Sequence, residues 1–102
     1  MALKFETKRV TIPLGKGNRS IEDQKPLNVT TITSAQVAVQ GFKLQFREGD
    51  NPVKLVEAGV LLSADPAGKD EVEFRVVCQY QDKTGNDEYS GHVDVLIIAD
   101  AV

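Results

Sequence analysis

The chain has 102 residues and contains no tryptophan and only one cysteine, one histidine and one methionine. A single cysteine cannot form a disulfide within the chain, so a small fold held together by disulfides is excluded. One histidine and one cysteine also fall short of the four ligands of a structural zinc site. We therefore expect a fold stabilised by its hydrophobic core, without a metal or a cofactor.

Long apolar runs and long basic runs are missing as well. The longest apolar run, residues 95–99, is far shorter than the roughly 20 residues of a transmembrane helix, and the N-terminal residues MALKFETKRV lack the apolar core of a signal peptide. The net charge is −3, and no basic run exceeds the pair Lys8 and Arg9. We expect a protein that is cytoplasmic, or exported without a visible signal peptide, with neither nucleic acid nor a membrane as its partner.

What the chain does contain is alternation of apolar and polar residues, which is typical of strands with one buried face. Similar patterns cover residues 3–12, 35–46, 53–63, 71–80 and 89–100, and residues 28–33 (NVTTIT) are expected to supply a sixth strand. No segment repeats with the period of a helix. The sequence therefore predicts one all-β domain over residues 1–102, a six-stranded antiparallel β-sandwich.

Some details of these strands can also be predicted. Beside Gly41 the apolar residues change phase, which predicts a β-bulge, and a similar change occurs between Phe5 and Val10. The polar residues 12–28 are expected to form a long loop. Residues 82–88 (DKTGNDE) are expected to form a hairpin turn between the two clearest strands.

The residue patterns of the sequence do not indicate a catalytic or metal site. Ser90, His92 and Asp94 share a strand face, but such neighbours stand ~6.6 Å apart on a flat surface, whereas a catalytic triad needs contact in a concave site. Acidic and amide oxygens in residues 82–88 could bind calcium, although they do not match an EF-hand loop, and a solvated turn is the simpler interpretation. We expect no enzyme.

Several apolar residues lie on strand faces opposite to the expected core. Either loops cover these residues, or they form an interface in a symmetric homo-oligomer. The residues are Leu55, Leu61, Val77, Leu96 and Ile98.

Taken together, the segments QVAVQGF, NPVKLVEAGVLL, EVEFRVVCQYQD and YSGHVDVLIIA, with Phe74 and the pair Tyr89 and Ser90, resemble the H-type lectin family. The resemblance covers about half of the chain. It implies a six-stranded sandwich that assembles as a homotrimer or a hexamer of two trimers. It also implies binding of galactose or N-acetylgalactosamine between subunits.

Carried over by position, the sugar-binding residues implied by the resemblance are Tyr80, Gln81, Lys54 and Tyr89, and Asp82 extends this edge. The chain has no tryptophan, and glutamine and lysine replace the histidine and arginine of the family. An ammonium does not reproduce the planar fork of a guanidinium, so the identity of the sugar stays open. The alternative role of the two tyrosines is structural: Tyr80 would cap a strand and Tyr89 would pair with it across a hairpin.

Overall fold

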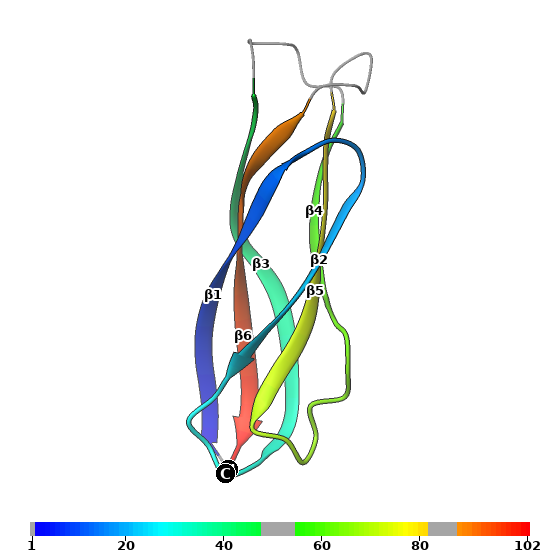
Figure 1. Cartoon of the computed structure of the whole chain (residues 1–102). Coiled ribbons are helices and arrows are strands. Elements are labelled where there is room, and N and C mark those ends of the chain that lie inside the picture. Colours follow the sequence, from blue (N-terminus) through cyan, green and yellow to red (C-terminus); the bar gives the residue numbers. More distant parts are fainter. Residues whose placement is uncertain (1, 48–54, 82–87) are drawn as a thin grey trace.

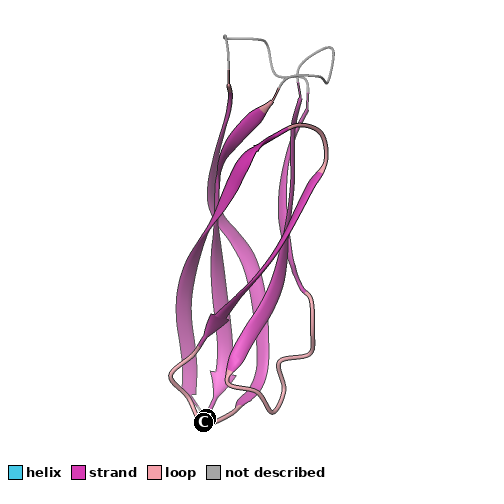
Figure 2. Ribbon diagram, in the orientation of Figure 1, coloured by secondary structure: helices cyan, strands magenta, loops and turns pink. Residues whose placement is uncertain are grey.

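A computed structural model describes residues 2–47, 55–81 and 88–102, and every structural statement below concerns these residues. Three-stranded antiparallel sheets of order β1-β6-β3 and β2-β5-β4 face each other (Figure 1). The strands are β1 (Ala2–Gly15), β2 (Arg19–Pro26), β3 (Ile32–Phe46), β4 (Leu55–Leu62), β5 (Glu71–Gln81) and β6 (Tyr89–Ala101). The predicted all-β class is confirmed, since the described chain consists of strands and loops (Figure 2). None of it is a helix that could cross a bilayer.

The core lies between the two central strands, β5 and β6. Along each strand every second side chain points to the opposite sheet, as the alternation predicted. A fully buried aliphatic or aromatic side chain of this kind stabilises the fold by about 1.5–3 kcal/mol. These inner rows, which are almost completely buried, comprise Val72, Phe74, Val76 and Cys78 on β5 and Val93, Val95 and Ile97 on β6.

The two changes of phase in the apolar pattern correspond to different backbone structures. The predicted bulge beside Gly41 is confirmed, because the register of β3 with β6 shifts between Val39 and Gly41. The change between Phe5 and Val10 is not a bulge, because β1 keeps an unbroken register with β6 from Ala2 to Ile12. Phe5 therefore lies on the outer face of its sheet, 63% exposed.

Two predictions about the first third of the chain are wrong. Residues 12–28 are not one long loop, because β1 continues to Gly15 and β2 begins at Arg19 and pairs with β5. Residues 28–33 are not a separate strand, because Ile32 already begins β3. Alternation of apolar and polar residues does not predict β2, because Asp23 and Lys25 occupy inner positions where apolar residues are expected.

The predicted hairpin between β5 and β6 is also wrong. β5 is the central strand of one sheet and β6 the central strand of the other, so the chain passes between the two layers. Turn residues and alternation are local features and do not reveal which sheet the next strand joins.

The sandwich is elongated, with extents of 49 × 18 × 17 Å. Its Cα radius of gyration is 15.6 Å, against about 13 Å for a compact globular chain of this length. Long strands running parallel to the main axis produce this shape (Figure 1). The C-terminus lies at one end, and the end of β5 and the start of β6 lie at the other, which we call the tip.

Candidate functional site

The binding residues expected from the sequence gather at the tip. Tyr80 and Gln81 are the last two residues of β5, and Tyr89 is the first residue of β6. Lys54 and Asp82 lie outside the described residues, as do residues 83–87 of the considered calcium site. The geometry of three of the five predicted residues can therefore be described.

Tyr89 is a core residue, with 0% of its surface exposed. Its hydroxyl donates to the carbonyl oxygen of Gly17 at 2.7 Å and lies 3.2 Å from that of Cys78. Burial, together with the hydrogen bond to the Cys78 thiol, raises the pKa of Tyr89 well above its ordinary value. Tyr89 thus ties the start of β6 to β5 and to the turn before β2, and its ring presents no surface to a ligand in this chain.

Tyr80 and Gln81 point to opposite faces of their sheet, because consecutive residues of a strand alternate. The Tyr80 ring is half-buried and lies 4.6 Å from the ring of Phe46 and 6.0 Å from that of Tyr89, measured between ring centroids. Gln81 lies on the outer face, where its amide nitrogen donates to the side-chain oxygen of Gln79 at 2.9 Å. The structure therefore brings the two tyrosines together and turns Gln81 away from them.

Phe46 belongs to this aromatic cluster and was not assigned to the site by the sequence analysis. Its inward direction follows from the bulge beside Gly41, after which residues 42, 44 and 46 face the opposite sheet. The phase of β3 was the signal that could have identified it. The aromatic cluster is thus Phe46, Tyr80 and Tyr89.

The edge beside the aromatic cluster is apolar. β3 and β4 are edge strands of different sheets and pack against each other across the layers. Phe42 of β3 and Val56 of β4 occupy inner positions, yet they remain 49% and 47% exposed. We call this surface the β3/β4 edge.

The opposite edge, formed by β1 and β2, is charged instead. Its inner positions include Glu6 and Lys8 on β1 and Asp23 and Lys25 on β2, all only partly buried. Inward-pointing charges on edge strands discourage a further chain from adding to the sheet. The two edges of the sandwich therefore differ in character.

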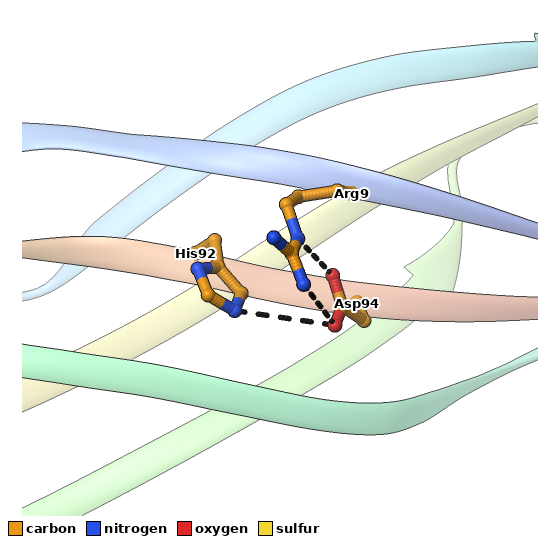
Figure 3. Close-up of polar contacts among 3 residues, drawn as sticks. All are labelled: Arg9, His92 and Asp94. Atoms are coloured by element: carbon orange, nitrogen blue, oxygen red, sulfur yellow. Dashed lines mark hydrogen bonds and ion pairs between the residues drawn. The ribbon is translucent and has the colours of Figure 1, made fainter.

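A polar cluster of Arg9, His92 and Asp94 lies on the outer face of the β1-β6-β3 sheet (Figure 3). Arg9 donates to both carboxylate oxygens of Asp94, at 2.8 and 3.1 Å. This pairing lowers the pKa of Asp94 and raises that of Arg9. His92 Nε2 lies 4.0 Å from Asp94 Oδ2, and in the described chain no hydrogen bond joins His92 to Ser90.

No family model, no curated protein and no solved structure matches this chain.

Proposed function

We propose that this chain is a lectin-like, carbohydrate-binding domain that acts as a homo-oligomer, with its sugar sites where the tip of one subunit meets a neighbour. The observation that carries the proposal is the contrast between the two edges. On the β3/β4 edge, Phe42 and Val56 leave apolar surface at inner positions in water, whereas Glu6, Lys8, Asp23 and Lys25 occupy inner positions of the β1/β2 edge. A second copy of the chain covering the β3/β4 edge would remove that apolar surface from water.

The position of the aromatic cluster supports sugar sites at such an interface. Val56 is the direct cross-strand partner of Tyr80, so the half-buried tyrosine borders the β3/β4 edge. An aromatic ring can cover the apolar C–H face of a sugar, while nearby amide and charged groups bind its hydroxyls. In this proposal Tyr80 stacks on the sugar, and Lys54 and Asp82 supply polar contacts, whereas Gln81, which lies on the opposite face of the sheet, would not contact the same sugar.

Tyr89 has a different role in the proposal from the one that the resemblance implied. Its buried ring lies behind Tyr80, and its hydroxyl is bonded within the chain. We therefore treat Tyr89 as a positioning residue that holds Tyr80, not as a sugar contact. Several equivalent sites in one oligomer would raise the avidity for a surface carrying many sugars.

The second candidate is a non-catalytic structural subunit that assembles without binding a glycan. The burial of Tyr89 favours it, because the core uses one of the two tyrosines that the resemblance assigned to the sugar. The elongated shape also suits a component of a larger assembly. Both candidates predict a homo-oligomer, and they differ only in whether its tip binds a glycan.

A glycan array combined with light scattering separates the two candidates. We expect an oligomer that binds galactose-type or amino-sugar glycans. We expect Tyr80→Ala to weaken binding about tenfold, while Tyr80→Phe, which keeps the ring, binds nearly as well as the original chain. Circular dichroism and thermal melting establish that each variant is folded.

The possible outcomes are distinct. An oligomer that binds no glycan on the array supports the structural subunit instead. A strictly monomeric protein contradicts both candidates, because each depends on contacts between copies.

A further inference from the structure

An open cleft of about 550 Å³ lies on the outer face of the β1-β6-β3 sheet, apart from the predicted sugar-binding residues. It is a shallow depression that is largely open to solvent, so a ligand there would stay partly in water. On one side it is bordered by Pro13 and Leu14, at the point where β1 leaves its regular register with β6, and Leu14 is 44% exposed. The polar residues that line the cleft are Arg9, Thr11, Lys43, Gln45, Ser90 and His92.

The register of the sheet explains why these side chains converge. Thr11 and Lys43 both lie directly opposite His92, on the two strands beside β6. Gln45 lies opposite Ser90 in the next row on this face. Neighbouring strands are about 4.8 Å apart, so three strands present these groups to one small ligand.

The cleft is positively charged although the protein as a whole carries a net charge of −3. Asp94 accepts two hydrogen bonds from Arg9, and Glu88, two residues before Ser90, is paired with Arg47, so both of these nearby carboxylates are already neutralised. Within residues 2–47, 55–81 and 88–102, Lys43 makes no ion pair, so its ammonium is the unbalanced charge of the cleft. A bound anion would supply the partner that this ammonium lacks.

We infer that this cleft binds the carboxylate of a small polyhydroxylated acid, of the class of the hexuronates. The carboxylate would lie between the Lys43 ammonium, which donates a charge-assisted hydrogen bond, and the His92 imidazole opposite it. Thr11, Gln45 and Ser90 supply hydroxyl and amide groups for the hydroxyls of the ligand, and Leu14 offers an apolar side wall. This site is independent of the function proposed for the tip, because it shares no residue with it.

The experiment is a titration of the complete chain, followed by NMR chemical shifts, with galacturonate, galactose, acetate and sulfate as separate probes. We expect saturable shifts with galacturonate at residues of the cleft, and binding at least several-fold weaker with the other three. Lys43→Gln is expected to weaken galacturonate binding about tenfold, since it removes a charge-assisted hydrogen bond. The matched control, Lys69→Gln, removes the same charge from a lysine that pairs with Glu73 on the other sheet, and it should have no effect.

Three outcomes would overturn this site. Equal binding of galactose and galacturonate would show that the carboxylate is not recognised. Equal binding of acetate or sulfate would show that the hydroxyls are not recognised. Equal weakening by Lys43→Gln and Lys69→Gln would show a general effect of net charge. A variant at the tip, Tyr80→Ala, should leave galacturonate binding in the cleft unchanged, so the two proposals can fail separately.

Discussion

At the scale of single residues, the Tyr89 hydroxyl offers a sharp test of the core. Tyr89→Phe removes the donor that serves the carbonyl oxygens of Gly17 and Cys78, and one of them is left without its partner. We expect a loss of about 1 kcal/mol in the free energy of unfolding, measured by urea denaturation. Tyr80→Phe is the control, because no hydrogen bond of the Tyr80 hydroxyl is found in the described chain, and it should cost little. Equal losses in the two variants would contradict this role of Tyr89.

The same region predicts a loss of stability at high pH. Burial is the main cause that raises the pKa of both Tyr89 and the Cys78 thiol above their ordinary values of 10.0 and 9.0. The folded chain therefore keeps protons that the unfolded chain releases, so the free energy of unfolding decreases as the pH rises above about 9.

Urea denaturation at several pH values between about 8 and 11 measures this effect. The decrease should be shallower in Tyr89→Phe, which has no phenol to ionise. A Tyr89→Phe variant whose stability falls as steeply as that of the original chain would show that other groups cause the decrease.

At the scale of secondary structure elements, the pairing of β6 with β3 depends on Gly91. A Cβ atom at this position would overlap the carbonyl oxygen of Lys43, and the backbone φ angle of 156° is one that other residues rarely adopt. We expect Gly91→Ala to destabilise the fold by roughly 2 kcal/mol or more, as judged from its denaturation midpoint. Gly41→Ala is the matched control, because nothing lies within 4 Å of a Cβ built there. A similar cost for both substitutions would contradict this close approach.

At the scale of the whole molecule, three exposed apolar surfaces of the described residues compete as the contact between copies. They are the β3/β4 edge with Phe42, the outer face of β1-β6-β3 with Leu3 and Phe5, and the outer face of β4 with Leu55 and Leu61. We expect Phe42→Ser to convert the oligomer into an 11.1 kDa monomer in light scattering, and Phe5→Ser to leave it intact. The opposite result would place the contact on the outer face of β1 and argue against sugar sites beside Tyr80.

The sequence predicted the central strands well and the edge strands less well. β5 and β6 were recognised because their inner positions are almost all apolar and regularly spaced. The pattern does not predict β2 because charged residues such as Asp23 lie at its inner positions. These positions are at the β1/β2 edge, where side chains are only partly buried. An edge strand needs less apolar surface than a central one, so its pattern is weaker.

The candidate site was predicted in part. Tyr80 and Gln81 do lie at the tip, since the end of the longest clear alternation marks the end of a strand. Their opposite directions also follow from the alternation. The burial of Tyr89 did not follow from it, because that depends on groups brought from elsewhere in the chain: its cross-strand partner Phe46, Tyr80 and Cys78 of β5, and Gly17 in the turn before β2.

The sequence by itself therefore determined the all-β class, the inner faces of β5 and β6 and the bulge beside Gly41, because alternation and its phase are local properties of the chain. Only the tertiary structure decided that β5 and β6 belong to different sheets, that Tyr89 is part of the core, and that Leu3 and Phe5 face outward. The partner of each strand is set by packing between residues far apart in the chain, and no local pattern carries that information.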